Sequence, residues 1–574
     1  MWRWREKTIV SVLVAALCVL LGRLVELQFV RGPQFARIAR RQHLAEEPIP
    51  ARPGDICDRE GRLLATSVEV ASLFLIPEQL DSPWTTCERL GLALGIDAQI
   101  LMDRVAARPE SQFLWVKRRL SAEERARVEA LELTPGTWGF REEYLRVYPQ
   151  GAVAAQVVGL RDIDGIGRGG VEEGCQVALR GRDGVREVRR DARGRVVEAL
   201  ERLDRPLEHG SEIQLTLDAV LQLHAEQTLA EVAATWKPKS CCAVVIDPRT
   251  GELLVMASWP GYDPNHPAGI SAASWKNRPL VDMYEPGSTF KPFIVAWALE
   301  QGRLRRDEVF DCENGEYRMG RRVLHDHHRY GALDVTDILV KSSNIGMAKI
   351  GERLTNAGLF DAARVFGFGA VTGIAVPGEL PGKLRPLSDW NSYSTGSVPM
   401  GQEIAVTPLQ TAVAYAALAN KGEWIAPRLV RRINQSDALA SPIVARVVDA
   451  ETAHWLCTGP LVEVVTRGTG KRAKLDGYRV FGKSGTAQKP DPATGRYSNR
   501  LHVSSFVCGA PAEAPRAIVV VSVDEPSTPG EHFGGTIAAP AAASILKKTL
   551  VRLHVPPGDR VADRADGAEG GVFE

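Results

Sequence analysis

The sequence predicts a multidomain protein of mixed α/β architecture, of the α+β type, with an N-terminal membrane helix. The chain has 574 residues, which is more than one hydrophobic core usually serves. An apolar run lies close to the N-terminus, and strand patterns flank a helical middle in the C-terminal half. This order favours a single sheet that is assembled from both ends of a domain and carries helices on its faces.

The first segment to explain is the apolar run from Ile9 to Leu21. Alone it would form about 20 Å of helix, which is short of the roughly 30 Å core of a bilayer. An extension to Leu27 reaches about 28 Å if Arg23 snorkels and Glu26 lies in the interface. No small-residue cleavage site follows, so an uncleaved anchor is favoured over a signal peptide. We expect a cytoplasmic tail at 1–7 and a transmembrane anchor at 8–28, although basic residues on both sides leave its orientation open.

The next segment, 29–205, is predicted to be an extended α+β module. It opens with a proline-rich, turn-forming stretch at 46–64. Helical periodicity follows from 81 to 133. Residues 185–197 then alternate like a β-hairpin whose turn lies at 192–194.

A second domain is expected at 210–552. Asp218 follows an alternating stretch and is placed to cap a helix that runs through Leu229. The last apolar run is nearly continuous and β-branched, which indicates a central strand. The strands that we expect are Ile213–Leu217, Cys242–Ile246, Leu253–Ala257 and Ala517–Val523.

Composition excludes several classes of protein. The chain has 71 basic and 70 acidic residues, so it has no basic excess for binding nucleic acid. Its nine cysteines include no Cys-x-x-Cys pair, which favours buried free thiols over a zinc knuckle or a disulfide framework. Residues 553–574 are rich in Asp, Gly and Ala and are expected to form a disordered tail.

Three short motifs carry the chemistry. Ser288 and Lys291 are three residues apart, which places them on one face of a helix, where the amine can serve the hydroxyl as a base. Ser342-Ser343-Asn344 and Lys483-Ser484-Gly485-Thr486 follow far along the chain. Each motif alone is weak, because a serine cap, a turn or a strand end would explain it equally well. Their occurrence together, in this order, makes chance an improbable explanation.

The order Ser-x-x-Lys, Ser-x-Asn, Lys-Ser/Thr-Gly resembles that of penicillin-binding proteins and serine β-lactamases. Further stretches resemble class B penicillin-binding proteins and extend the likeness over nearly the whole chain. These stretches are Arg52–Gly61, Arg146–Pro149, Gly170–Glu172, Leu215–Asp218, Asp247–Glu252, Val406–Gln410 and Gly534–Thr536. Glu285–Lys291 and Lys341–Asn344 are more similar to the division-type (FtsI-like) enzyme than to the elongation type. Two departures are Ser484, where most members carry threonine, and Gly468-Thr469-Gly470, where Gly-Thr-Ala is commoner.

The resemblance implies an extended pedestal of the dimerisation type, followed by a penicillin-binding/β-lactamase-like transpeptidase domain with an antiparallel sheet flanked by helices. It implies a peptidoglycan D,D-transpeptidase that cross-links stem peptides through a serine acyl-enzyme, acts in septal wall synthesis and binds penicillin covalently. Ser288 would be the nucleophile, Lys291 its base and Ser342 a proton donor to the leaving amine. Asn344 would hold Lys291 and the substrate backbone, and Lys483 would attract the terminal carboxylate. Ser484, Gly485 and Thr486 would bind substrate, and the backbone N–H groups of Ser288 and Thr486 would form the oxyanion hole.

The resemblance also implies partners and a location. The ligands would be stem peptides and β-lactams, and the protein partners a SEDS-type lipid II polymerase (FtsW-like) and other division proteins. The chain would cross the cytoplasmic (inner) membrane once, with its bulk on the periplasmic side. No metal and no organic cofactor is expected.

Alternatives remain for the function and for three side features. The chain could be an elongation-type transpeptidase, a D,D-carboxypeptidase or β-lactamase with water as acceptor, or an idle division scaffold. His325-Asp326-His327-His328 has the ligand types of a zinc site, but adjacent side chains on an extended chain diverge, so a solvated loop is favoured. Asp58-Arg59 is interpreted as a structural ion pair or turn. Glu172 is expected to orient the pedestal.

Overall fold

The computed structural model describes residues 2–35, 44–190, 196–437, 443–491, 494, 496–530 and 532–558. The expected hairpin turn at 192–194 and most of the expected tail lie outside the described residues. The chain divides into two compact units, and neither is contiguous in sequence. The first unit comprises Met1–Gly54, Ser67–Leu145 and Arg180–Gly210, and the second Asp55–Thr66, Arg146–Leu179 and Ser211–Glu574.

The N-terminal helix begins at the start of the described chain. α1 (Trp2–Val25) continues into a π-helical turn, η1 (Glu26–Val30). Arg3–Val30 is the one helix in the described part of the chain that is long and apolar enough to cross a membrane. Glu26 pairs with both Arg23 and Arg31. These ion pairs place the charges at the end of the apolar segment, where a membrane interface would solvate them.

The first unit contains the expected hairpin. β8 pairs antiparallel with both β1 and β9 to form a three-stranded sheet. A separate apolar core gathers three helices against the end of β3 and against β4. β4 interrupts the helical stretch predicted at 81–133, because Leu114 and Lys117 pair with β3 and the chain there is extended. The elements are β1 (Leu44–Ile49), β3 (Leu63–Leu75), α3 (Pro83–Leu94), α4 (Ala98–Ala106), β4 (Leu114–Lys117), α5 (Ala122–Glu129), β5 (Trp138–Val147), β8 (Gly184–Arg190) and β9 (Val196–Arg205).

A five-stranded antiparallel sheet forms the centre of the second unit. Its strand order is β12-β11-β25-β24-β23, so strands from both ends of the domain meet in it, as the sequence predicts. The β-branched run at 517–523 lies in β25, the middle strand. β23 lies at an edge, which leaves one side of its backbone open. The strands are β11 (Ser240–Ile246), β12 (Leu253–Trp259), β23 (Phe481–Pro490), β24 (Tyr497–Ala510) and β25 (Ala517–Asp524).

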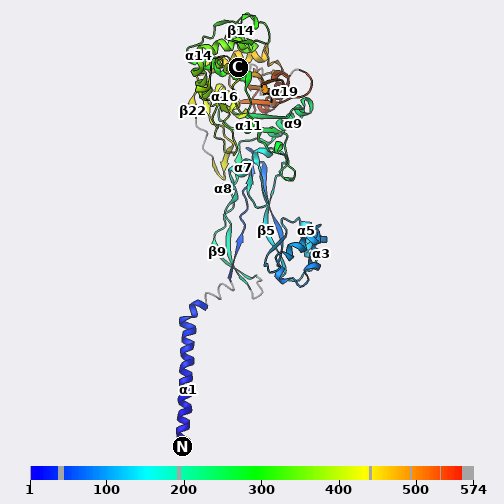
Figure 1. Ribbon diagram of the computed structural model, residues 1–574, viewed down its shortest axis with the longest axis vertical. Helices are drawn as coiled ribbons and strands as arrows, with labels where there is room; N and C mark the ends of the chain where they lie inside the picture. Colours follow the sequence, from blue (N-terminus) through cyan, green and yellow to red (C-terminus); the bar gives the residue numbers. More distant parts are fainter. Residues whose placement is uncertain are drawn as a thin grey trace, which may run out of the picture. The chain divides into compact units, whose positions relative to one another are not determined.

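Alternate side chains of this sheet enter two different cores. Val245 and Val521 pack with α9 (Ala219–Trp236) and α19 (Gly534–Arg552), which Figure 1 shows side by side. Val244 and Val520 belong to the core that includes α12 (Lys291–Glu300) and α16 (Pro408–Ala419). The sheet is therefore buried on both faces, as its near-continuous apolar strands require. The remaining elements near the site are η3 (Gly287–Phe290), β15 (Arg322–His325), α13 (Val335–Lys341), α14 (Asn344–Val365), α17 (Ala450–Thr458), α18 (Pro460–Thr466) and η7 (Lys471–Ala473).

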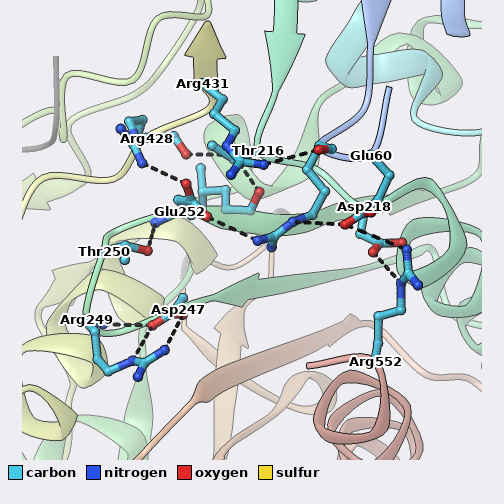
Figure 2. Close-up of polar contacts among 12 residues, drawn as sticks. Glu60, Thr216, Asp218, Asp247, Arg249, Thr250, Glu252, Arg428, Arg431 and Arg552 are labelled. Atoms are coloured by element: carbon cyan, nitrogen blue, oxygen red, sulfur yellow. Dashed lines mark hydrogen bonds and ion pairs between the residues drawn. The ribbon is translucent and has the colours of Figure 1, made fainter. Parts of the chain in front are cut away.

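A polar network ties the edge strands of the second unit to its helices. Asp58 is fully buried and accepts hydrogen bonds from the backbone N–H of Glu60, Arg62 and Ala219. Asp218 caps α9 as predicted and lies 2.7 Å from Arg552 of α19. Arg428 donates to Glu252 at 2.7 Å. Both pairs are drawn in Figure 2. The Glu252 carboxylate also lies 3.5 Å from the Arg59 guanidinium. Asp58 therefore lies in a turn and pairs with Arg62 at 2.8 Å, whereas Arg59 pairs with Glu252, so the turn fits the sequence interpretation and an ion pair between Asp58 and Arg59 does not.

Candidate active site

Ser288 lies on a tight turn that leads into α12. The turn, η3, has 3-10 geometry, and Lys291 begins the α-helix. Gly287 has φ +54°, a region that disfavours side chains, and a Cβ on it would lie 3.2 Å from the Thr486 carbonyl oxygen. A Cβ on Gly401 would come within 2.2 Å of the Gly287 oxygen. The turn is therefore packed on both sides by backbone, which holds Ser288 beside β23.

Ser342 is held in a strained backbone conformation between two helices. It ends α13 with φ 59° and ψ 40°, a left-handed conformation that costs a non-glycine residue on the order of 1 kcal/mol. Ser343 then caps α14, and its hydroxyl accepts from the Gly346 N–H at 3.0 Å. The Ser342 hydroxyl donates to Ser288 Oγ at 2.8 Å. The break between the helices thus brings the second motif to the first.

Asp326, which belongs to neither helix, stabilises the break between α13 and α14 through hydrogen bonds. Its carboxylate accepts from the Ser343 hydroxyl at 2.7 Å and from the Ile345 N–H at 3.1 Å, and the Asn344 N–H also donates to it. The sequence prediction of a solvated loop at 325–328 is therefore wrong for this residue. The described residues contain no group of three or more His, Cys, Asp or Glu side chains that could hold a metal. An isolated aspartate in a polar loop gave no signal for its capping role.

The Lys291 amine is fully buried and surrounded by oxygen acceptors. It donates to the Ser342 carbonyl at 2.7 Å, to Ser342 Oγ at 3.2 Å, to the Ser343 carbonyl at 3.3 Å and to Asn344 Oδ1 at 2.9 Å. Burial lowers the pKa of Lys291 to about 7, and the charge of Asp326 opposes this shift. The hydrogen-bonded route from Lys291 to Ser288 runs through Ser342, whereas the sequence interpretation had the amine reach the hydroxyl directly.

A second buried amine approaches from β23. Lys483 Nζ donates to Ser342 Oγ at 3.1 Å and to the Ser484 carbonyl at 3.1 Å. Burial, followed by the charge of Lys291, lowers the pKa of Lys483 well below its ordinary value. Two amines and two hydroxyls thus share one hydrogen-bonded cluster, and Ser342 Oγ is its centre.

The other groups of the third motif are held by backbone and side-chain contacts. Ser484 Oγ hydrogen-bonds Thr469 Oγ1 at 2.7 Å, and Thr486 Oγ1 accepts from the Gly534 N–H at 3.1 Å. A Cβ on Gly485 would lie 2.5 Å from Ser505 Oγ and 2.9 Å from the Pro286 carbonyl, so only glycine fits. Ser484, which stands where threonine is commoner, still supplies a hydroxyl, and this hydroxyl is the one bonded to Thr469.

The Gly468-Thr469-Gly470 departure also gains a structural reason. A Cβ on Gly468 would lie 2.7 Å from the Val340 carbonyl, and one on Gly470 would lie 3.0 Å from the Phe506 ring. The sequence analysis assigned Thr469 no role. In the structure its hydroxyl forms a hydrogen bond with Ser484 in β23. The sequence held no signal for this pairing, because the two hydroxyls meet only in the fold.

These groups line a cleft of about 600 Å³. Of the predicted residues, Ser288, Ser342, Ser484 and Thr486 line it, while Lys291 and Lys483 are buried. Asn344 holds Lys291 and donates to the His325 carbonyl at 3.0 Å. His327 also lines the cleft, and burial followed by the Lys291 charge lowers its pKa. The Ser288 hydroxyl is connected through Ser342 to two amines of lowered pKa, an arrangement that can activate a nucleophile for acyl transfer.

Comparison with known protein families agrees with this geometry. Residues 241–547 match the penicillin binding protein transpeptidase domain, and residues 48–215 match the penicillin-binding protein dimerisation domain. The first match covers the three motifs and the five-stranded sheet.

Similar proteins extend over almost the whole chain. The chain is 35% identical over 568 residues to the probable peptidoglycan D,D-transpeptidase PbpC of Pseudomonas aeruginosa, covering 98% of both chains. It is 31% identical over 560 residues to the peptidoglycan D,D-transpeptidase FtsI of Escherichia coli, covering 96% of this chain and 92% of that one. The crystal structure of penicillin binding protein 3 from Mycobacterium tuberculosis, complexed with aztreonam, superimposes with a TM-score of 0.69 at 27% identity. That match covers 89% of this chain and 98% of the other.

Ser288, the two buried amines and the order of the motifs therefore occur within a fold and a sequence that agree on one family. The matches span both the dimerisation domain and the transpeptidase domain. The chain belongs to the class B penicillin-binding proteins, a family of serine-type peptidoglycan transpeptidases.

Proposed function

We propose that this protein cross-links peptidoglycan stem peptides by D,D-transpeptidation through an acyl-enzyme on Ser288. The observation that carries the proposal is the chain of hydrogen bonds from Lys291 through Ser342 to Ser288. Ser342 Oγ also receives Lys483, so the serine that contacts the nucleophile is the meeting point of both amines. A serine is a weak nucleophile without such a base.

In the acylation step, Ser288 Oγ attacks the carbonyl of the penultimate D-alanine. Its proton passes through Ser342 Oγ to Lys291, which can accept it because a pKa of about 7 leaves much of the amine neutral near neutral pH. The backbone N–H groups of Ser288 and Thr486 would stabilise the oxyanion, which is worth about 3 kcal/mol for each donor. Ser342 then returns the proton to the amine of the departing D-alanine.

Binding of the terminal carboxylate is assigned to the third motif. Ser484 and Thr486 line the part of the cleft where the end of the peptide would lie, Lys483 would add its charge from a buried position in the same strand, and Gly485 lets β23 approach the turn that carries Ser288. In the second step an amine of a neighbouring stem attacks the acyl-enzyme. A β-lactam would enter in the same way and remain on Ser288, because its leaving group stays attached.

The proposal is tested by replacing the nucleophile. Ser288→Ala should abolish covalent labelling by a fluorescent penicillin, measured on the full-length protein in detergent by gel fluorescence. Ser436→Ala, at an exposed position, is the matched control and should label fully. Label on the Ser288→Ala protein at full stoichiometry would remove Ser288 from its role. Cross-linked dimer, rather than free D-alanine alone, would separate a transpeptidase from a carboxypeptidase.

We further propose a septal role, a single-pass anchor with the bulk of the chain on the periplasmic side, and the domain division 29–205 and 210–552. The division-type pattern at Glu285–Lys291 and relatives named FtsI and PenA support the role. The partners would be an FtsW-like lipid II polymerase and other division proteins. A fluorescent fusion should gather at the division site, and an even lateral distribution would favour the elongation role.

A further inference from the structure

One wall of the active-site cleft carries positive charge that no carboxylate in the cleft balances. Lys341, Arg467, Lys471 and Arg472 line the cleft, and none of the lining residues is acidic. Lys341 and Arg467 are ion-paired with Asp337 at 3.2 Å and 2.7 Å. Lys471 and Arg472 are exposed and have no ion-pair partner within the described part of the chain. The unbalanced charge of this wall is therefore concentrated on two adjacent side chains.

The segment 468–472, which carries these two cations, is packed against the backbone of neighbouring elements. A Cβ on Gly468 would meet the Val340 carbonyl at 2.7 Å, and one on Gly535 would meet the Thr469 carbonyl at 2.1 Å. α13 and the start of α19 thus press directly on this segment. Arg472 Nη1 adds a long hydrogen bond of 3.4 Å to the Thr536 carbonyl. Cations on a fixed support lose less entropy when they bind an anion.

The segment that leads to Lys471 contacts a residue that we assign to the binding of the leaving group. Thr469 Oγ1 bonds Ser484 Oγ at 2.7 Å, and Ser484 is a residue that we assign to the carboxylate of the departing D-alanine. Lys471 follows Thr469 by two residues. In the second step the attacking amine takes the place that the leaving amine has vacated. The acceptor amine is therefore delivered to the same cleft that Ser484, Lys471 and Arg472 line.

We propose that Lys471 and Arg472 form a subsite for a carboxylate of the acceptor, so that the preferred acceptor is an amine on an acidic peptide. This inference rests on the proposed function, because it concerns the second half of that reaction. The amine nitrogen attacks the ester carbonyl carbon, the bond from that carbon to Ser288 Oγ breaks, and an amide bond forms. The proton that the amine loses passes through Ser342 to Ser288 Oγ. Lys471 and Arg472 only hold the acceptor and take part in no bond change.

The test measures how the acyl-enzyme partitions between water and an acceptor. The full-length protein in detergent is acylated by a thioester donor in the presence of one of two short peptides. The peptides share the same free amine and differ only in carrying glutamate or glutamine. For the unmodified protein we expect the ratio of aminolysis to hydrolysis to be about tenfold higher with the glutamate peptide. This preference should shrink as ionic strength rises.

Three variants test whether Lys471 and Arg472 bind the acceptor or have another role. Lys471→Gln with Arg472→Gln should reduce the preference to within about twofold, while the rate of acylation by benzylpenicillin stays unchanged. Arg472→Lys should retain most of the preference, because the charge remains. Lys474→Gln removes an exposed cation just beyond the cleft wall and should keep the full preference.

Three outcomes would overturn the inference. The unmodified protein could treat both peptides equally, or the double variant could keep the preference. The double variant could also lose benzylpenicillin acylation to the same extent, which would assign the two cations to the donor or to the fold. A failure of the unmodified protein to acylate with any β-lactam would instead contradict the proposed function, so the two failures are distinguishable.

Discussion

Two of the sites at which the second unit buries cations treat them in opposite ways. In the active site, Lys291 and Lys483 are fully buried among hydroxyl and carbonyl oxygens, and neither has an ion-pair partner among the described residues. In the segment 146–179, Glu172 is fully buried and pairs with Arg146 and Arg161, each at 2.6 Å. One site has cations without a carboxylate, and the other has a carboxylate between two cations.

The difference shows what each site can do. A buried amine without a counter-charge loses its proton easily, which is why burial lowers the pKa of both lysines. An arginine cannot lose its proton in this way, so it must be paired when it is buried. The unpaired lysines are suited to proton transfer, and the paired arginines to holding chain segments together. Glu172, expected from the sequence to orient the pedestal, has the contacts of such a structural residue.

The largest effect is expected when the unpaired cation is removed. Lys291→Met should lower the rate of acylation by benzylpenicillin by at least about a thousandfold, because Ser288 loses its base. The fold should persist, since methionine fills a similar volume and no buried charge loses a partner. Stopped-flow or gel-based acylation kinetics measures the first effect, and thermal unfolding measures the second.

The control for this change is a lysine outside the cluster. Lys474→Met should acylate at the unmodified rate. A Lys291→Met protein that unfolds at a much lower temperature would show that the amine is structural, and the contrast between the two sites would fail.

The second-largest effect is expected at the paired site, where removing the charge of the carboxylate should destabilise the fold without slowing acylation. Glu172→Gln leaves Arg146 and Arg161 buried without a counter-charge, which should cost about 3 kcal/mol of the free energy of unfolding. The acylation rate of the molecules that remain folded should change by less than about twofold. Denaturant titration of the variant and of the unmodified protein measures the loss in the free energy of unfolding.

Glu173→Gln is the matched control for the paired site. Glu173 is the next residue and also accepts a backbone hydrogen bond, from the Gly169 N–H at 2.7 Å, but it is exposed and lies in no buried pair. It should cost less than about 1 kcal/mol. Equal losses for the two variants would contradict the assignment of a special role to the buried pair.

The sequence predicted those parts of the fold that depend on local pattern. The β-branched run at 517–523 indicated the central strand, and Asp218 indicated a helix start, because strand propensity and capping are local properties. β4 was missed because its pairing with β3 is a tertiary contact that overrides the helical periodicity around it. Aromatic residues at 113 and 115 were the available signal for a strand there.

The residues of the site could be predicted from the sequence, but the hydrogen-bonded path that connects Lys291 to Ser288 could not. Of the residues in the three motifs, Ser288, Lys291 and Lys483 lie in hydrogen-bonded contact with Ser342, and Ser484 and Thr486 line the same cleft. That Lys291 reaches Ser288 through Ser342 depends on the left-handed conformation of Ser342, which no residue pattern revealed. Asp326 and Thr469 were missed for a related reason, because each acts through partners that are not its neighbours in sequence.

The smallest effect is expected from pH. The pKa of Lys291 is lowered from its ordinary 10.5 to about 7, so the neutral amine that we propose as the base predominates above this value and is lost below it. The acylation rate constant should therefore rise through pH 7 and level off, and at pH 6 it should be roughly tenfold lower than at pH 8.

His327, whose imidazole lines the cleft, provides the check on this profile. The pKa of His327 is lowered from 6.5 by burial, so this side chain should gain its proton only at lower pH than Lys291 does. In a His327→Gln protein the midpoint near pH 7 should stay in place. A midpoint that disappears with His327, or a rate that is flat down to pH 6, would mean that Lys291 is not the base. In that case the unpaired cations of the active site would serve, like the paired arginines, to hold the fold.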